Sequence, residues 1–407
     1  MRHSFFREIL CICVLQIELS ITKDILFYNV NSNSHMMSAL PLLNNKIFDK
    51  QWDLLLIDPL FALCGFTAAL ANKENVPYAI LSSTVTFDFL DQRLARGVMY
   101  SYNPPMFFDF DRLDWSADQF LDRWNSFKEY ARFGTAFTWY NVMKDVSGTV
   151  TDLPSMLETP LPQSGSTVSY GSTCAQAKPL PESLENFVND PQSKGTILVA
   201  FGSVVDWRTA PKAVKKAFRN ALEKLHEYRV IWAYQDDPET LNVSAHITLM
   251  KWVPQFDVLN DKRTVLFVTH GGMKSVKELV CAGVPALLMP LFADQTLTTF
   301  ISIRKLKIGA HLNKLRLTTE NVYNSAQSLL LNRRVKENVQ KVRAMFREGA
   351  APIPPIDEAA FAVEKIMRSS ERKQWQSQRK GRLLHFEQYF CLDVLALAIV
   401  VVLLMSK

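Results

Sequence analysis

Hydrophobic and polar positions follow two different periods along the chain. Short apolar runs bounded by turn residues predict buried strands, and longer segments with apolar residues at helical spacing predict helices. The predicted strands cover residues 24–30, 54–57, 78–82, 196–200, 229–232, 247–249, 265–269 and 286–290. The predicted helices cover residues 63–75, 83–94, 184–188, 210–226, 273–282, 299–306, 319–331 and 335–348. Strands that alternate with helices in this way are typical of doubly wound α/β sheets.

The clearest β–α–β unit lies within residues 251–295. A buried strand over 265–269 stops at the pair Gly271-Gly272, and the following helix over 273–282 is expected to end at Gly283. A second buried strand comes directly after it. Ligands of parallel α/β sheets bind at the carboxyl ends of the strands, so the loops of this unit are predicted to form a binding edge.

The side chains at these strand ends suit a nucleotide sugar. A helix that opens on two glycines binds an anion, because its free N–H groups and its dipole point at the ligand, and His270 stands where it can donate to a phosphate oxygen. Trp252 offers a flat face for a base, while Asp294 and Gln295 suit vicinal hydroxyls. Alone, a tryptophan is as readily a core residue and a histidine a hydrogen-bonded buried imidazole. The fixed order of the three motifs favours the binding site.

The runs W-x-P-Q, H-G-G and D-Q in this order resemble the donor-binding signature of the UDP-glycosyltransferases, in the animal membrane-bound UDP-glucuronosyltransferase and UDP-glucosyltransferase branch. The likeness extends from about Lys23 to the C-terminus. It implies an α/β fold of the GT-B type, in which two Rossmann-like domains face a cleft, followed by a C-terminal transmembrane helix. The implied parts are a signal peptide (1–20), an acceptor-side domain (21–180), a UDP-sugar-binding domain (181–380) and an anchor (386–405).

The resemblance also implies roles for single residues of the second domain. Trp252 would stack on uracil, His270 would bind the diphosphate, Glu278 would bind the ribose hydroxyls, and Asp294 with Gln295 would bind the sugar. The helix near its end, over 335–348, would cross back toward the first domain. The full set of expected donor-binding residues is Ser203, Trp252, Gln255, His270, Gly271, Gly272, Lys274, Ser275, Glu278, Asp294 and Gln295.

Two residues near the N-terminus are candidates for proton transfer. His35 and Asp58 each follow a predicted strand, and a carboxylate beside a histidine fixes its tautomer and stabilises the imidazolium, as a general base requires. An isolated loop histidine is more often simply exposed. The resemblance implies that His35 deprotonates the acceptor and that Asp58 supports it. Only residues 36–53 separate these two loops, where the family usually has several dozen more, so the N-terminal domain is interpreted as shortened.

Two functions follow from the resemblance. The first is an inverting UDP-glycosyltransferase that moves glucuronate or a hexose from UDP-glucuronate or UDP-glucose to a small lipophilic acceptor. The second is a catalytically silent, UDP-binding membrane paralogue that pairs with an active transferase, favoured by the shortening and by Lys274 where the family usually has Asn. No metal or other cofactor is implied, because the D-x-D pair of metal-dependent transferases occurs only at Asp109-Phe110-Asp111, far from the nucleotide motifs.

Composition and the chain ends add a location. The 407 residues suffice for two domains, and the net charge of +6 is spread without a basic block, which gives no support for a nucleic-acid partner. Basic residues before an apolar run within 1–20 predict a signal peptide, and the apolar stretch over 391–405 predicts a single-pass anchor. An endoplasmic-reticulum type of membrane protein with lumenal domains is therefore expected, with Asn242-Val243-Ser244 as a glycosylation acceptor and lipid as a partner.

Three further features leave alternatives open. The aromatic-rich segment 100–146 has helical spacing around 117–144 and would form an acceptor channel, a membrane-associating surface or ordinary core packing. Residues 151–182, rich in Pro, Ser, Gly and Thr, are predicted to be a linker or a surface crossing between domains. Of the six cysteines, Cys64, Cys174 and Cys281 fall in the body of the chain and are interpreted as buried or incidental thiols. A homo- or hetero-oligomer is compatible with every feature.

Overall fold

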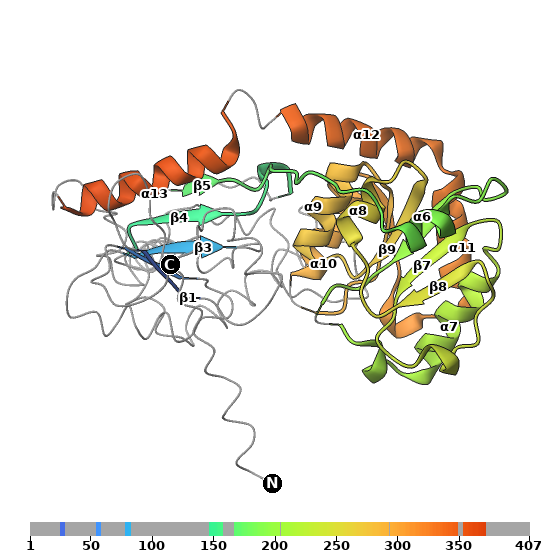
Figure 1. The fold of residues 1–407 in the computed structure, drawn as a ribbon. Helices are drawn as coiled ribbons and strands as arrows, with labels where there is room; N and C mark the ends of the chain where they lie inside the picture. Colours follow the sequence, from blue (N-terminus) through green and yellow to red (C-terminus); the bar gives the residue numbers. More distant parts are fainter. Residues whose placement is uncertain are drawn as a thin grey trace, which may run out of the picture.

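The computed structural model describes residues 25–28, 54–57, 78–82, 146–157, 167–203, 205–292, 294–348 and 353–371, in which the strands form two parallel sheets (Figure 1). The candidate base His35, its partner Asp58, the predicted signal peptide, most of the aromatic-rich segment and the predicted anchor over 386–405 lie outside the described residues. Within them, no helix combines the length and the apolar character that a membrane span requires.

The first sheet has five strands in the order β1-β2-β3-β4-β5, and all neighbours are parallel. The strands predicted over 24–30, 54–57 and 78–82 are confirmed as the first three of them. The other two were not predicted, and the last lies inside the segment interpreted as a linker. The bounds are β1 Ile25–Tyr28, β2 Leu54–Ile57, β3 Tyr78–Ser82, β4 Gly148–Thr151 and β5 Thr167–Ser169.

The second sheet has six strands in the order β11-β10-β9-β6-β7-β8, which confirms the predicted doubly wound arrangement. The chain runs outward from β6 to β8, returns to the other side of β6 at β9, and runs outward again to β11. The point where the strand order reverses therefore lies between β6 and β9, which is where ligands of such sheets bind. The bounds are β6 Thr196–Val199, β7 Arg229–Ala233, β8 Ile247–Met250, β9 Thr264–Thr269, β10 Ala286–Leu288 and β11 Gly309–His311.

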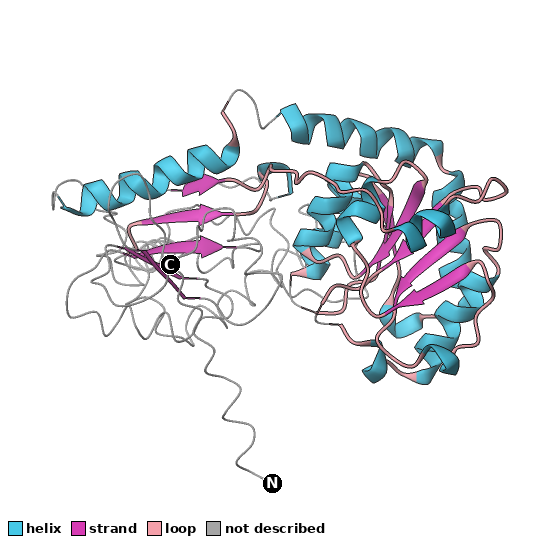
Figure 2. Cartoon of the chain, in the orientation of Figure 1, coloured by secondary structure: helices cyan, strands magenta, loops and turns pink. Residues whose placement is uncertain are grey.

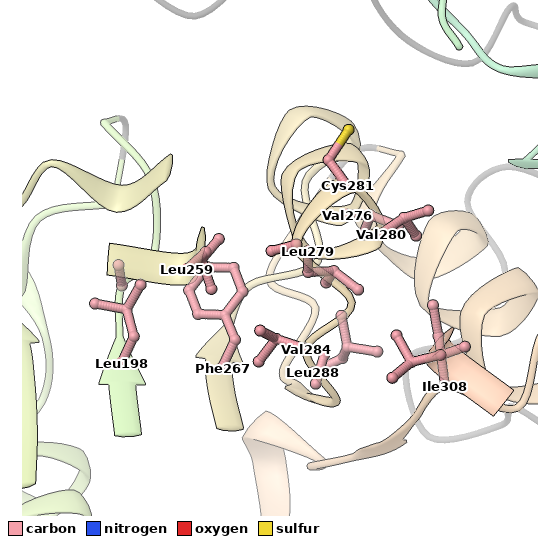
Figure 3. Close-up of a cluster of buried hydrophobic side chains, with 14 of the residues drawn as sticks. Leu198, Leu259, Phe267, Val276, Leu279, Val280, Cys281, Val284, Leu288 and Ile308 are labelled. Carbon is pink, nitrogen blue, oxygen red and sulfur yellow. The ribbon is translucent and has the colours of Figure 1, made fainter. Parts of the chain in front are cut away.

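Alternate side chains of these strands enter two separate cores, as the period of a strand requires. On one face, Val199 and Val268 pack with α7 (Lys212–Glu223) and α11 (Thr319–Leu331). On the other, Leu198 and Phe267 pack with helices α8, α9 and α12. The bounds of these three helices are Gln255–Asn260, Met273–Ala282 and Arg333–Glu348. Figure 3 shows Leu198 and Phe267 together with Leu259 of α8 and Leu279 of α9, and Figure 2 shows helices on both faces of this sheet. Both faces of the second sheet are thus covered by helices.

Two helices match their predictions residue for residue. Both α9 and α11 begin and end where the apolar spacing places them, and Gly283 adopts the left-handed conformation (φ 74°) expected of a residue that ends a helix. The helix predicted over 299–306 instead begins as α10 (Gln295–Phe300) and continues as a π-helical turn, η5 (Ile301–Lys305). Its start is therefore at the D-Q motif itself.

Residues near the end of the described chain return to the first sheet. The helix predicted over 335–348 to cross back toward the first domain is α12, which packs against α9 on the second sheet and runs toward the first sheet in Figure 1. The following helix, α13 (Pro355–Glu371), makes the return and packs against β4 and β5 (Figure 1). Its buried residues Ala359, Val363 and Met367 share a core with strand residues of the first sheet.

The interpretation of Cys174 and Cys281 as thiols is also wrong. They form a disulfide with a sulfur–sulfur distance of 2.07 Å, between the segment after β5 and the end of α9. The two cysteines lie 107 residues apart in the chain and have no recognisable sequence spacing, so only the fold brings them together. The remaining segment before the second sheet carries one helix, α6 (Glu182–Val188).

Candidate functional site

The candidate site begins at the two loops that follow β6 and β9, the strands beside the switch point. The turn after β6 contains Phe201, whose ring makes edge contacts with Trp207 and Phe218 at centroid distances of 5.3 and 5.7 Å. Next to it, Gly202 has φ +74°, and a Cβ atom there would lie 2.8 Å from Cε1 of His270. A Cβ on Gly272 would also collide with that ring. Two glycines therefore create the space that His270 occupies.

His270 is held in this space as a neutral imidazole. Burial lowers the pKa of His270 to about 4, because a protonated ring in this site would carry its charge away from water. Nδ1 lies 3.3 Å from Oγ1 of Thr269, within hydrogen-bonding distance. At neutral pH the ring is thus uncharged and offers a hydrogen bond rather than a positive charge. The side chain is half-buried and stands at the start of α9.

The amino end of α9 is the candidate anion site beside His270. Its N-cap is Gly272, and no side chain caps the first turn. The first N–H groups of a helix have no partner within the helix, so they remain available to a ligand together with the helix dipole. Thr298 holds the glycine turn in place, because its hydroxyl donates to the carbonyl oxygens of Gly271 and Gln295, the latter at 3.0 Å. The glycine turn and α10 are thereby tied together.

A cluster of polar side chains, formed by Gln255, Ser275 and Glu278, lies one turn further along α9. Nε2 of Gln255 donates to Oε2 of Glu278 at 2.5 Å and to Oγ of Ser275 at 3.2 Å. Burial raises the pKa of Glu278, and the hydrogen bond from Gln255 opposes that shift by stabilising the carboxylate. Burial also lowers the pKa of Lys274, while the charge of Glu278 opposes this change. The sequence prediction that Gln255 and Glu278 belong to one site agrees with this contact.

Trp252 and Ser203 lie at the exposed edge of the site. The side chain of Trp252 is 71% exposed, so the alternative of a core residue is wrong, and an exposed indole face suits stacking. Ser203 is exposed in the turn after β6. Among the described residues, Trp252 and Phe292 are the exposed aromatic side chains nearest in sequence to the motifs.

Asp294 and Gln295 are both buried, at the start of α10. Oε1 of Gln295 accepts hydrogen bonds from the backbone N–H groups of Leu291 and Phe292, at 2.8 and 3.1 Å. The amide oxygen therefore shapes the loop after β10, and the Nε2 group is the part of Gln295 that remains for a hydroxyl. The sequence prediction assigned Gln295 to the hydroxyls of a sugar and did not include the hydrogen bonds that its amide oxygen accepts within the loop.

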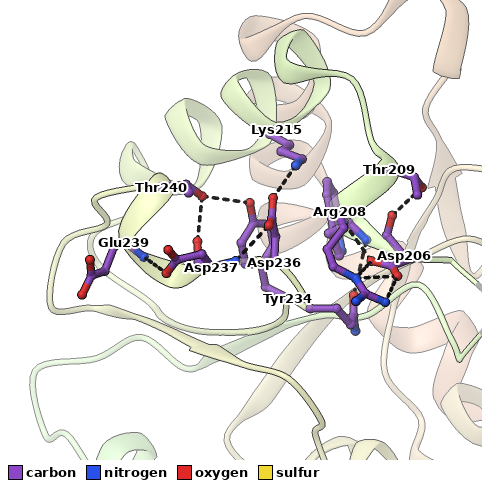
Figure 4. Close-up of polar contacts among 11 residues, drawn as sticks. Asp206, Arg208, Thr209, Lys215, Tyr234, Asp236, Asp237, Glu239 and Thr240 are labelled. Atoms are coloured by element: carbon purple, nitrogen blue, oxygen red, sulfur yellow. Dashed lines mark hydrogen bonds and ion pairs between the residues drawn. The ribbon is translucent and has the colours of Figure 1, made fainter.

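The loops after β6 and β7 carry polar contacts that the sequence did not predict (Figure 4). The guanidinium of Arg208 pairs with Asp206 at 2.5 Å, and Nζ of Lys215 pairs with Asp236 at 2.6 Å. These hydrogen bonds lower the pKa of both carboxyl groups, so the pairs are charged at neutral pH. Gln235, beside them, donates to the carbonyl oxygen of Lys251 at 3.4 Å and so connects this rim to the loop that carries Trp252.

The chain has two parallel sheets, with glycine turns beside the switch point of the second, and comparison with solved structures places this fold in the GT-B class. A UDP-glucose:anthocyanidin 3-O-glucosyltransferase solved with UDP is 19% identical and matches with a TM-score of 0.56, over 79% of this chain and 76% of that one. A UDP-glucosyltransferase from Polygonum tinctorium is 18% identical and matches with a TM-score of 0.58, over the same shares of the two chains.

Sequence comparison then identifies the family. The model of the UDP-glucoronosyl and UDP-glucosyl transferase family matches residues 112–406, well over half of the chain. Human UDP-glucuronosyltransferase 1A7 is 27% identical over 93% of this chain and 72% of its own length, and mouse UDP-glucuronosyltransferase 1A1 is 27% identical over 99% and 76%. The chain belongs to the UDP-glucuronosyl and UDP-glucosyl transferase family, and the resemblance seen in the sequence is confirmed.

Proposed function

We propose that this chain transfers glucuronate or a hexose from its UDP conjugate to the hydroxyl of a small lipophilic acceptor, with inversion at the anomeric carbon. The observation that carries the proposal is the gathering of Gln255, Glu278, His270 and the amino end of α9 around one strand switch point. Relatives at 27% identity are named UDP-glucuronosyltransferases, and a structure with the same fold was solved with UDP.

The donor fits this arrangement group by group. The uracil stacks on the exposed indole of Trp252, and the ribose hydroxyls meet the carboxylate of Glu278 that Gln255 holds in place. The diphosphate lies against the N–H groups at the start of α9, with a further hydrogen bond from neutral His270. The sugar reaches Asp294 and Gln295. Every one of these contacts uses a described residue of the second sheet and its loops.

Transfer is a single displacement. The acceptor oxygen attacks the anomeric carbon on the face opposite UDP, so the configuration inverts as the bond to the UDP oxygen breaks and its electron pair leaves with UDP. We propose that His35 takes the acceptor proton and that Asp58 orients His35, although both lie outside the described residues. The start of α9 stabilises the charge that develops on the departing diphosphate, which is preorganised electrostatic catalysis.

The proposal includes a location, a lumenal body on a single-pass anchor of the endoplasmic-reticulum type. The Cys174–Cys281 disulfide supports it, because disulfides persist in oxidising compartments and are rare in the cytosol. Asn242 supports it as well, since the residue is exposed in a surface loop, where a glycan can be attached. Loss of a mobility shift on endoglycosidase treatment in an Asn242→Gln variant is the expected check.

The decisive experiment separates binding from turnover. Calorimetry with UDP is expected to show binding by the wild type, and incubation with UDP-glucuronate or UDP-glucose and a panel of phenols is expected to yield the glycoside. His35→Ala should abolish transfer while leaving UDP affinity unchanged, and His226→Ala, at an exposed position, should change neither. A wild type that binds UDP and never transfers a sugar would favour the silent paralogue. A wild type that does not bind UDP would refute both functions.

A further inference from the structure

One side of helix α9 carries the residues proposed to bind the UDP-sugar, and another side carries two bonds to the chain around the first sheet. Ser275 and Glu278 face Gln255, as their hydrogen bonds show. Lys277 and Cys281 are four residues apart and therefore lie on a common face of the helix, one above the other. Lys277 is bonded to Asp152, which follows β4 of the first sheet, and Cys281 to Cys174, which follows β5. The helix that presents the anion site is thus fixed from outside its own sheet.

The first attachment is an ion pair between Lys277 and Asp152. Nζ of Lys277 contacts Oδ1 of Asp152, and the two side chains are only 15% and 7% exposed. Asp152 directly follows β4, and its N–H donates to the carbonyl oxygen of Ser82 on β3 at 2.8 Å. The carboxylate is therefore held by the backbone of the first sheet. Removal of one partner from a buried pair leaves an uncompensated charge, so the position of Lys277 depends on Asp152.

The second attachment, the Cys174–Cys281 bond, joins the same part of the chain. The segments after β4 and β5 are packed together: the N–H of Tyr170 donates to the carbonyl oxygen of Thr151 at 2.9 Å, and a Cβ atom on Gly171 would lie 2.6 Å from the carbonyl oxygen of Asp152. Asp152 and Cys174 thus belong to one anchor. The disulfide holds the carboxyl end of α9, and the ion pair lies one turn closer to the amino end that would bind the diphosphate.

We propose that Asp152 is a positioning residue of the donor site: from the first sheet, through Lys277, it fixes the half of α9 that carries the anion site and Glu278. This inference rests on the proposed UDP-sugar function and adds to it a residue from the acceptor-side sheet. Neither Asp152 nor Lys277 is needed as a ligand contact. Their role is to keep the first turns of α9 in register with the loop of His270 while the disulfide keeps the other end in place.

The test measures UDP affinity by calorimetry and hydrogen exchange of the α9 amides by mass spectrometry. Asp152→Asn and Lys277→Gln are each expected to speed exchange over residues 273–282 and to weaken UDP binding by about 2- to 30-fold, the range for residues that couple to a site without touching its ligand. Because the two residues act as one attachment, the double variant should lose no more UDP affinity than either single variant. The disulfide remains in every variant and keeps α9 joined to the segment after β5.

Asp190→Asn is the matched control. It breaks the pair of Asp190 with Arg229 (2.6 Å, each side chain 25% exposed) at the opposite end of β7 from the site. It should leave both α9 exchange and UDP affinity at wild-type values. UDP affinity that is unchanged in Asp152→Asn, or losses that add in the double variant, would overturn the positioning role alone. Absence of UDP binding by the wild type would instead overturn the proposed function and the donor-site role that rests on it.

Discussion

His270 makes the stability of the folded chain depend on pH in a predictable direction. Burial lowers the pKa of its imidazole from the ordinary 6.5 to about 4, so the folded chain binds the proton more weakly than the unfolded chain does. The stability that results is fully present above pH 6.5 and is lost as the pH falls from 6.5 toward 4. One pKa unit corresponds to 1.36 kcal/mol, so the whole difference is worth about 3 kcal/mol, of which about 2 kcal/mol is lost between pH 7 and pH 5.

The measurement is urea unfolding of the wild type and of His270→Gln at those two pH values. The variant lacks the titrating group, so its free energy of unfolding should fall between the two pH values by about 2 kcal/mol less than that of the wild type. Carboxyl groups that titrate near the lower pH contribute equally to both proteins and cancel. His226→Gln, at an exposed position, controls for loss of a histidine as such and should keep the wild-type difference. Equal differences for wild type and His270→Gln would refute the buried, neutral imidazole.

Three further outcomes are expected. Trp252→Ala should weaken UDP binding by about 5- to 150-fold in calorimetry, the usual loss when a base no longer stacks on an aromatic ring. The unfolding midpoint should not change, because the side chain is exposed, and unaltered UDP affinity would show that the indole does not belong to the site. Gly283→Ala should lower the free energy of unfolding in urea by about 1–2 kcal/mol, because φ is +74° there and an added Cβ would lie 2.7 Å from Nε2 of Gln340; an unchanged midpoint would contradict this. Lys274→Asn should weaken UDP binding more at low than at high salt, because salt screens a partly exposed charge contact. Identical UDP affinities of the wild type and the variant across a salt series would place the ammonium away from the diphosphate.

The sequence predicted best those elements whose ends are determined locally. Helix α9 matched to the residue because Gly272 opens it and Gly283 closes it, and both are backbone requirements written in the neighbouring residues. The apolar run of β9 was recognisable for the same reason. In contrast, β4 (GTVT) and β5 (TVS) have no apolar run, and they are strands because neighbouring backbone pairs with them. Such pairing is a property of the tertiary fold, so local patterns could not predict it.

The candidate site shows the same division. The order and spacing of the motifs were enough to propose Trp252, Gln255, Glu278 and His270 as site residues. The hydrogen bond between Gln255 and Glu278 became visible only in the structure. Asp152 and Lys277 are 125 residues apart, and neither belongs to a motif. The disulfide was missed because its two cysteines have no characteristic spacing. Partners on different sheets become visible only when the chain has been folded.

The return of α13 to the first sheet has a consequence for how the chain is made. Strands β4 and β5 are complete by Ser169, but the residues of α13 that cover their apolar face begin at Ile356. A ribosome supplies these parts from the N-terminus onward, so this face of the first sheet stays without its helix until the whole second sheet has been synthesised. Completion of the first sheet is therefore a late event in biosynthesis, and a nascent chain interrupted before Pro355 leaves Val150 and Tyr170 without the helix that packs on them.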